Sequence, residues 1–396
     1  MAVGSNTPIF GTLIYKFQQV RVARPTIEYA MSHIPLKEKG VNIMSDVYKK
    51  LAKHLDNLPG GYPATESGVE IRILKRLFTD QEAEIAVSLT MIPEPCSAIA
   101  ERLNMDEKEL SKLLYDMSKK GLLVRSSKTG ENFYMAAQFV IGIWEYHVND
   151  LDEGLIKDFN EYVPYLAKQW EKQKTQQLRV IPVSQSISAG MNIMPYEEAE
   201  NIIKSQSKIV VADCICRKEH KMTDKGCDKP METCLVFGGG AYFYEENGLA
   251  RSISKEEALE ILNKGIKADL VLQPGNAKKP TNICMCCGCC CQVLKNIKKL
   301  DLPPAKVVCS SYYATVDEEE CTGCEACVES CQMDAITIED DTAQVNLDNC
   351  IGCGLCVTAC DFEAISMAEK AEKDKWVPPP NVVHTYIDIA KERGLM

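Results

Sequence analysis

Two matching runs of four cysteines constrain the fold of this chain more than any other feature of its sequence. The first run has the spacing C-x2-C-x2-C-x3-C, and the second repeats it 29 residues later; their cysteines are Cys321, Cys324, Cys327 and Cys331, then Cys350, Cys353, Cys356 and Cys360. An internal repeat of this kind is very improbable by chance. Thiols at such short spacings bind metal, so this segment is expected to fold around two metal–sulfur groups.

The spacing is that of bacterial two-cluster ferredoxins, and residues 312–369 resemble that family. The resemblance implies two [4Fe–4S] clusters, each held by three cysteines of one run and the last cysteine of the other. That last cysteine is expected to open a helix that points away from its own loop. Cluster one would take Cys321, Cys324, Cys327 and Cys360, and cluster two would take Cys350, Cys353, Cys356 and Cys331.

Other features of this segment fit or modify the resemblance. The glycines of the loops, such as Gly323 and Gly352, would let backbone amides approach the sulfurs, and residues 335–338 and 343–346 read as a hairpin. The residue after the last cysteine of each run is often proline in ferredoxins, but here it is Gln332 or Asp361. Because four cysteines leave no iron open to substrate, the implied role is electron transfer at low potential. Zinc knuckles are the alternative.

Ten more cysteines lie upstream in two groups. Six of them crowd into residues 284–291, where adjacent side chains diverge and cannot all face one centre. We interpret the ten as ligands of one or two additional [4Fe–4S] clusters; zinc or free redox-active thiols are alternatives. The ten candidate ligands are Cys214, Cys216, Cys227, Cys234, Cys284, Cys286, Cys287, Cys289, Cys290 and Cys291.

Three further residues, two cysteines and a histidine, lie outside these candidate ligands. Cys96 and Cys309 stand apart from the groups and are expected to be small buried apolar residues. His220 follows the Cys214–Cys216 pair closely, and is expected either on the surface or as a ligand.

The composition favours reduced thiols in the cytoplasm. The chain has 396 residues, 20 cysteines and a net charge of −11. A disulfide-linked secreted protein is disfavoured, because residues 1–30 lack the pattern of a signal peptide and a chain this long needs no staples. No apolar run approaches the length of a membrane span, the longest being 139–144, so we expect no membrane insertion. The acidic balance makes nucleic acid an improbable partner.

Composition and pattern divide the chain and predict an α+β fold. Codons for Lys39-Gly40-Val41 can form a ribosome-binding sequence before Met44, so we hypothesise a start at Met44. The expected parts are a translated leader or flexible arm (1–43), a helical and winged-helix-like domain (44–137), a helical connecting region (138–207) with a strand at 179–186, a Cys-rich metal-binding domain (208–300), the ferredoxin domain (305–370) and a tail helix (371–396).

Residues 66–137 resemble a winged-helix domain of bacterial regulators. A helix at 97–103, a turn, a helix from the Asp106 cap to Gly121 and a two-stranded wing follow in the required order. The second helix mixes its lysines with Glu107, Glu109 and Asp116. A reader of the major groove needs net positive charge. We therefore expect an adaptor or interface, with DNA binding as the alternative.

Residues 44–370 as a whole resemble 4Fe–4S dicluster-domain proteins of anaerobic bacteria and archaea. The resemblance rests on Cys214-Ile-Cys216-Arg217, on the later cysteines and on both ferredoxin runs. We expect an electron carrier, rather than an enzyme, that exchanges single electrons with an oxidoreductase or a low-potential donor. The alternatives are a redox-sensing regulator and a reductase subunit with a catalytic cluster. Gly238–Gly240 lack a nucleotide-binding context and are expected to form a loop.

Overall fold

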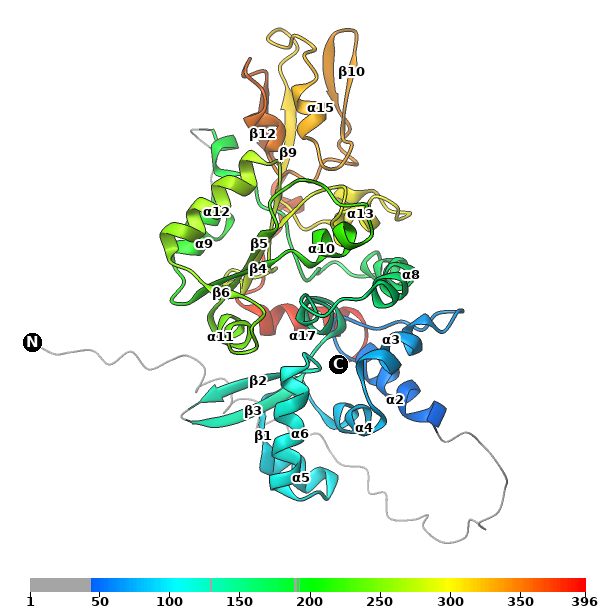
Figure 1. Ribbon diagram of the computed structural model, residues 1–396. Coiled ribbons are helices and arrows are strands. Elements are labelled where there is room, and N and C mark those ends of the chain that lie inside the picture. The colour runs from blue at the N-terminus through cyan, green and yellow to red at the C-terminus, as the bar shows by residue number, and fades with distance from the viewer. Residues whose placement is uncertain (1–43, 129, 189–190, 192) are drawn as a thin grey trace, which may run out of the picture. The chain divides into compact units, whose positions relative to one another are not determined.

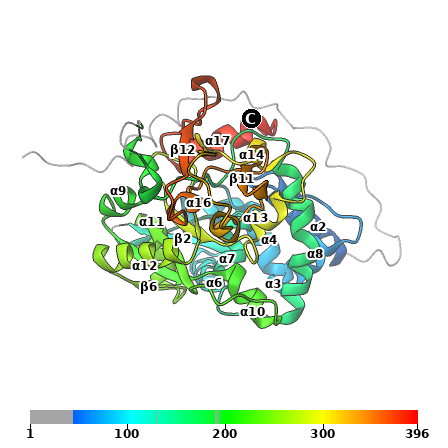
Figure 2. The same cartoon turned by 90° about the horizontal axis from the view of Figure 1, so that it is seen from above.

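The computed structural model describes residues 44–396 apart from 129, 189–190 and 192. The hypotheses about residues 1–43 therefore concern a part of the chain that lies outside the described residues. The described elements mix helices and sheets, as the α+β class requires. They can be followed in Figure 1 and, from above, in Figure 2.

Three helices begin the described chain: α2 (Met44–Asp56), α3 (Val69–Leu77) and α4 (Asp80–Ser88). The sequence predicts all three, because their apolar residues recur at helical spacing. The predicted capping box opens α4: the Thr79 hydroxyl accepts from the Glu82 N–H, and the Glu82 carboxylate accepts from the Thr79 N–H. This exchange satisfies two N–H groups that a helix start leaves without partners.

Helices α5 (Cys96–Leu103) and α6 (Glu107–Lys119) come next, followed by a hairpin of β2 (Leu123–Lys128) and β3 (Glu131–Ala136). Strand β1 (Glu94–Pro95) pairs with β3 and completes a three-stranded antiparallel sheet. Asp106 caps α6 by accepting from the Glu109 N–H. The predicted helices and hairpin are confirmed; that they form a winged helix stays a prediction.

The connecting region differs most from expectation. Helices α7 (Trp144–Tyr146) and α8 (Glu153–Trp170) are helical as predicted, whereas the turn η1 (Phe139–Ile143) has non-helical backbone angles at Val140, Ile141 and Gly142. Their aromatic rings pack in the core, where Trp144 stacks on Phe159 with centroids 3.6 Å apart. The described residues between 171 and 198 are largely irregular, with 3-10 turns η2 (Ser184–Ser186) and η3 (Pro195–Glu197), and α9 (Ala199–Lys204) follows. For these described residues the expectation of a mostly helical region is wrong.

The strand predicted at 179–186 is also wrong, and the reason is visible in its hydrogen bonds. Successive N–H groups of the segment bond to three separate parts of the chain, and Pro182 has no N–H to give. Val180 donates to the Cys309 carbonyl, Ile181 to that of Leu272, and Val183 to that of Cys353. The segment therefore joins the middle of the chain to the ferredoxin-type part, instead of belonging to one sheet.

The Cys-rich middle is built on an antiparallel sheet of five strands in the order β6-β4-β5-β8-β7. Helix α12 (Lys255–Lys267) packs on β4 and β5 and against α9 (Figure 1). Helix α10 (Ile215–Met222) follows β4, and α13 (Gln292–Ile297) comes after β8. The strands are β4 (Ile209–Asp213), β5 (Glu232–Phe237), β6 (Arg251–Ser252), β7 (Val271–Pro274) and β8 (Asn282–Cys286).

The glycine run in this region does not form the expected loop. Gly238–Gly240 make the first turn of α11 (Gly238–Glu246), directly after β5. Gly238 adopts a φ of 57°, a conformation that other residues rarely take. The glycines therefore turn the chain from a strand into a helix, and the prediction of a loop is wrong.

The carboxyl-terminal domain contains two small antiparallel sheets. Strand β9 (Tyr312–Val316) pairs with β12 (Ile365–Glu369), and β10 (Ile336–Glu339) forms the predicted hairpin with β11 (Thr342–Val345). Each cysteine loop leads into a short helix, α15 (Ala326–Ser330) or α16 (Leu355–Thr358), and α14 (Pro304–Val307) precedes the domain. Apolar side chains such as Ile336, Ile365 and Met367 form a small core that also includes cysteines.

The tail returns to the start of the described chain. It contains a 3-10 turn, η4 (Glu372–Asp374), and helix α17 (Val382–Glu392), so the helix is shorter than the predicted 371–396. The Glu392 carboxylate accepts from the N–H groups of Lys174 and Thr175. The Arg393 guanidinium donates to the Leu58 carbonyl and to Asp56. Among the described residues, no helix combines the length and apolarity needed to cross a membrane.

Candidate metal centres

Two cavities in the carboxyl-terminal domain divide the eight cysteines of the repeated runs. Each cavity receives three cysteines of one loop and the last cysteine of the other loop, as the ferredoxin resemblance implies. The cavities are lined by Cys321, Cys324, Cys327 and Cys360 in one case, and by Cys331, Cys350, Cys353 and Cys356 in the other, together with apolar side chains.

Backbone groups of the loops complete both cavities. The N–H of Ala343 donates to the Cys321 Sγ, and the N–H of Ala335 donates to the Cys331 Sγ, each at 3.3 Å. Gly352 has a φ of 70°, and a Cβ there would collide with the Tyr312 carbonyl. Cys331 ends α15 and Cys360 follows α16, so the expectation that the last cysteine of each run opens a helix is wrong.

These thiols are held where a bare thiolate is unfavourable. Burial raises the pKa of Cys327, of Cys331 and of Cys356, and it raises the pKa of Cys353 to about 12. A bound cation reverses this preference, because its charge favours the deprotonated sulfur. A sulfur-rich, apolar cavity with inward N–H groups therefore fits an iron–sulfur cluster. If bound, such clusters would supply one-electron redox chemistry, and the four cysteines of each cavity would hold one cluster.

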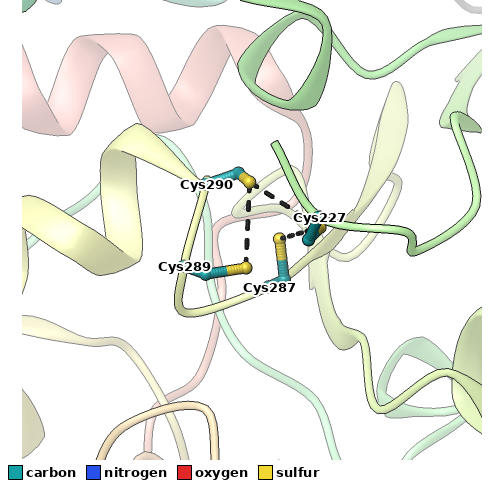
Figure 3. A group of neighbouring side chains, drawn as sticks. All are labelled: Cys227, Cys287, Cys289 and Cys290. Atoms are coloured by element: carbon teal, nitrogen blue, oxygen red, sulfur yellow. Dashed lines mark hydrogen bonds between the residues drawn. The ribbon is translucent and has the colours of Figure 1, made fainter. Parts of the chain in front are cut away.

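A third set of thiols lies in the middle of the chain, and we call it the four-thiol site. Cys227 comes from the loop between α10 and β5, and Cys287, Cys289 and Cys290 come from the turn between β8 and α13. The four Sγ atoms all lie within 4.8 Å of one another (Figure 3). Cys227 is 4.0 Å from Cys287 and 3.7 Å from Cys290, and Cys289 is 3.7 Å from Cys290.

The remaining six candidate ligands form the six-thiol array: Cys214, Cys216, Cys234, Cys284, Cys286 and Cys291. Cys234 on β5 and Cys284 on β8 are cross-strand partners, and Cys286 is two residues further along the same face of β8. Cys214 and Cys291 precede the first turns of α10 and α13. The thiols of 284–291 thus fall into two groups, and Cys227 lies with the four-thiol site; that both groups bind metal stays a prediction.

Hydrogen bonds between the thiols link this array from one end to the other. Cys234 and Cys286 donate to Cys284 and lower its pKa, while Cys216 and Cys286 donate to Cys291 and lower its pKa. The same bonds raise the pKa of Cys234 and of Cys286, and hydrogen bonds with Cys214 and Cys291 raise the pKa of Cys216. Neighbouring thiols of the array therefore share their protons through hydrogen bonds. Metal binding would release the remaining protons.

Arg217 lies between the two middle sites. Its side chain is only 1% exposed. Its Nη1 donates to the Cys287 Sγ of the four-thiol site at 3.7 Å, and its Nη2 donates to the Met285 carbonyl at 3.0 Å. Although burial opposes the charge, the neighbouring Cys214, Cys287 and Cys286 raise the pKa of Arg217. A permanent positive charge thus lies among the thiols and offsets their negative charge.

The four-thiol site also touches the ferredoxin-type domain. The Gly288 N–H donates to the Gln332 Oε1 at 2.8 Å, and Gln332 directly follows Cys331 of the second cavity. A Cβ on Gly288 would collide with the Gln332 carbonyl. Gln332 is one of the two residues that replace the usual proline. Proline would offer no side-chain acceptor there, so the departure from the ferredoxin pattern has a structural use.

The three isolated residues, His220, Cys309 and Cys96, do not belong to any of the cysteine groups in the described structure. His220 is buried, so the surface expectation is wrong; its Nδ1 bonds to the Cys216 carbonyl at 2.8 Å and its Nε2 accepts from Lys295 at 2.8 Å. Both ring nitrogens are therefore engaged without a metal. Cys309 is buried as expected, and burial raises its pKa to about 12. Cys96 is half-buried, so the expectation of full burial is wrong.

One residue near the six-thiol array, Glu145, is not predicted to lie there by any pattern in the sequence. Glu145 is half-buried, and its Oε2 accepts from the Gly142 N–H at 2.8 Å. Burial, together with the charges of Cys284 and Cys214, raises the pKa of Glu145 to about 8, although backbone hydrogen bonds partly oppose the shift. It lies after a distorted turn in which Ile141 has a φ of 44°. A lone glutamate in an aromatic segment gives no pattern that predicts this placement.

The contact between Gly288 and Gln332 can be tested by substitution. Gly288→Ala places a methyl group against the Gln332 carbonyl, and we expect a loss of about 1–3 kcal/mol in unfolding free energy. Gly239→Ala is the matched control, because Gly239 is exposed in a helix and has nothing near its Cβ position. Urea unfolding of the anaerobic protein measures both. Equal midpoints for the two variants would contradict the close contact.

The raised pKa of Glu145 predicts a pH dependence of stability. Its carboxyl group is protonated more readily in the folded state, since its pKa rises from 4.5 to about 8. Its contribution is fully present below pH 4.5 and is lost as the pH rises to about 8, by up to roughly 1.4 kcal/mol per pH unit. Glu145→Gln lacks this loss, so its unfolding free energy relative to the wild type should increase between pH 5 and 8. A difference that does not change with pH would rule out the buried carboxyl.

Comparison with known proteins agrees with the geometry of the carboxyl-terminal domain. A family model described as a 4Fe-4S dicluster domain matches residues 314–367. This range contains all eight cysteines of the repeated runs. No curated protein matches the chain. The carboxyl-terminal domain is therefore similar to ferredoxin-type domains with two [4Fe–4S] clusters, and the chain has the features of iron–sulfur electron transfer.

Proposed function

We propose that this protein transfers single low-potential electrons through two ferredoxin-type [4Fe–4S] clusters and at least one further [4Fe–4S] cluster, to or from an oxidoreductase partner. The observation that carries the proposal is the interleaved division of eight cysteines between two cavities. Fully ligated clusters offer substrates no open iron, so their function is to accept and pass on electrons. A reducing cytoplasm is the compartment that suits so many free thiols.

The first cavity is the better placed for exchange with a partner. Cys324 is exposed, whereas the cysteines of the second cavity are buried or half-buried. The acidic residues Asp317, Glu318, Glu319 and Glu320 are all exposed directly before Cys321. Such a surface favours a basic partner and speeds its approach. The same charges oppose addition of an electron, which supports a low potential for this cluster.

The six-thiol array supports the further cluster. Its thiols are close enough to share hydrogen bonds, and they come from two strands and two helix starts. Contacts link it to the ferredoxin-type domain in two steps: Arg217 joins it to Cys287, and Gly288 joins that turn to Gln332 beside Cys331. These contacts suggest a path for electrons from the surface cluster into the middle of the protein.

The winged-helix-like unit fits an interface better than DNA recognition. Arg125 is buried and paired with Glu246 at 3.0 Å, and Lys119 donates to the Glu246 carbonyl at 2.6 Å. Asn247 donates to the Ser118 carbonyl on the same side. Arg125 and Lys119, two cations that could otherwise contact phosphates, are thus bound to Glu246 in the middle of the chain. The redox-regulator alternative is the less favoured one.

A reductase subunit with a catalytic cluster is the second candidate function. The observation that favours it is Glu145, whose carboxyl group lies near Cys214 and Cys284 and keeps its proton up to about pH 8. A proton donor beside a metal centre is useful in reductions that add both electrons and protons. A substrate-dependent change in the EPR signal of one cluster would identify this function.

Paired cysteine substitutions test the ligand assignment. Cys321→Ala with Cys360→Ala removes two ligands of the same cluster, so the protein should lose about four iron atoms per chain. Cys321→Ala with Cys331→Ala removes one ligand from each cluster, and the expected loss is about eight. Iron and acid-labile sulfide of the anaerobic full-length protein provide the measurement, with Cys96→Ala as the control. Equal losses in the two double variants would refute the interleaved arrangement.

Electron transfer itself is tested with cytochrome c, a basic one-electron acceptor. The reduced full-length protein should reduce it at a rate that falls as salt is added, because salt screens the attraction to the acidic surface. Cys321→Ala should slow the transfer by about tenfold or more, since it removes the cluster nearest that surface. Cys96→Ala should leave the rate unchanged. The double variant Cys321→Ala with Cys331→Ala lacks both ferredoxin-type clusters. If it reduces cytochrome c at the wild-type rate, this route is disproved.

A further inference from the structure

We propose that the four-thiol site binds a single tetrahedral Zn²⁺ ion through Cys227, Cys287, Cys289 and Cys290, and that this ion is structural. The inference concerns a site apart from the ferredoxin-type clusters. It does not depend on the electron-transfer function, because a metal content can be measured whatever the protein does.

The spacing of the sulfurs distinguishes one ion from a cluster. A Zn–S bond is about 2.3 Å long, so a tetrahedral ion holds its sulfurs about 3.8 Å apart. The Sγ separations of Cys289–Cys290, Cys227–Cys290 and Cys227–Cys287, at 3.7, 3.7 and 4.0 Å, agree with that value. A [4Fe–4S] cube places a separate iron at each of four corners and spreads its thiolates further. Among the described residues, this is the only set of His, Cys, Asp or Glu ligand atoms that gathers so tightly.

The comparison with the rest of the chain strengthens this reading. The eight cysteines of the ferredoxin-type domain line cavities and have no such tight arrangement in the described structure. The two ferredoxin-type cavities are therefore the wide settings that suit cubes, and the six-thiol array pairs its sulfurs in a row. Among the described residues, only the four-thiol site gathers four sulfurs around one point, as a single ion requires. Four sulfur ligands in a tetrahedron are the usual shell of a structural zinc site, which leaves no open position.

The charge around the site fits a tetrathiolate ion. Four thiolates and one Zn²⁺ carry a net charge of −2, which has to be balanced where the ligands are buried. Arg217 supplies positive charge at 3.7 Å from the Cys287 Sγ. Cys287 and Cys290 are buried, while Cys227 is half-buried and Cys289 is exposed. The ion thus has one side toward solvent, through which it can enter.

The position of the ion explains what it would do. It would tie the loop that carries Cys227 to the turn that carries the other three ligands (Figure 3). Gly288 lies in that turn and donates to Gln332 of the ferredoxin-type domain. Fixing the turn therefore also fixes the surface on which the second cluster loop rests. The ion would act as a clamp between the Cys-rich middle and the electron-transfer domain.

The test is the metal content and the zinc X-ray absorption spectrum of the full-length protein, purified without oxygen from cells supplied with zinc and iron. We expect about one zinc per chain beside the iron, with a shell of four sulfurs at about 2.3 Å. Cys289→Ser should lower the zinc content severalfold or replace one sulfur in the shell by oxygen. Cys289 is exposed, so this variant should fold.

Cys96→Ser is the matched control, since Cys96 lies outside every thiol group, and it should keep one zinc with four sulfurs. Absence of zinc from the wild type, an iron atom in this site, or a zinc shell of nitrogen and oxygen would overturn the proposal. So would a Cys289→Ser variant that keeps the four-sulfur shell. If Cys289→Ser instead removes about four iron atoms and four sulfides, the site holds a cube.

Discussion

The cost of burying sulfur without a cation is the constraint on which this fold depends. All but two of the 20 cysteines lie in groups of four or six, which bring together loops, strands and short helices. Burial raises the pKa of thiols such as Cys353 and Cys356, so these positions disfavour thiolates in the absence of a metal. A bound metal makes the buried thiolates favourable, because its positive charge stabilises them and its bonds to sulfur link the segments that carry them.

Specific contacts join the groups, in addition to a shared hydrophobic core that includes Cys287, Met333 and Leu355. Gln332 accepts from Gly288, Arg217 reaches Cys287, and Val183 donates to the Cys353 carbonyl. Each contact involves a residue next to a proposed metal ligand or the ligand itself. A change in the charge of one centre would therefore be felt at the next through one or two side chains.

The sequence predicts the parts of this protein that follow a local pattern. The spacing of Cys321 to Cys360 predicts which thiols line each cavity, and the capping signals at Thr79 and Asp106 predict two helix starts. The division of residues 284–291 between two centres follows from the divergence of adjacent side chains. The partners of Cys227, by contrast, depend on how the loop after α10 meets the turn after β8, and no local pattern encodes that contact.

Other features were missed for the same reason, because they depend on contacts between residues that are far apart in the sequence. The segment 179–186 reads as a strand, but its N–H groups bond to Cys309, Leu272 and Cys353, which are far away in the sequence. The placement of Glu145 near Cys214 and the contact of Gln332 with Gly288 are also long-range. The unusual residue after Cys331 was the one available signal, since glutamine stands where ferredoxins often have proline.

A crystal structure with anomalous diffraction collected at the iron and zinc absorption edges would test the central claim most directly. The account predicts iron in the two ferredoxin-type cavities and in the six-thiol array, and zinc alone among Cys227, Cys287, Cys289 and Cys290. Iron confined to the two carboxyl-terminal cavities, with no metal among the other thiols, would contradict it.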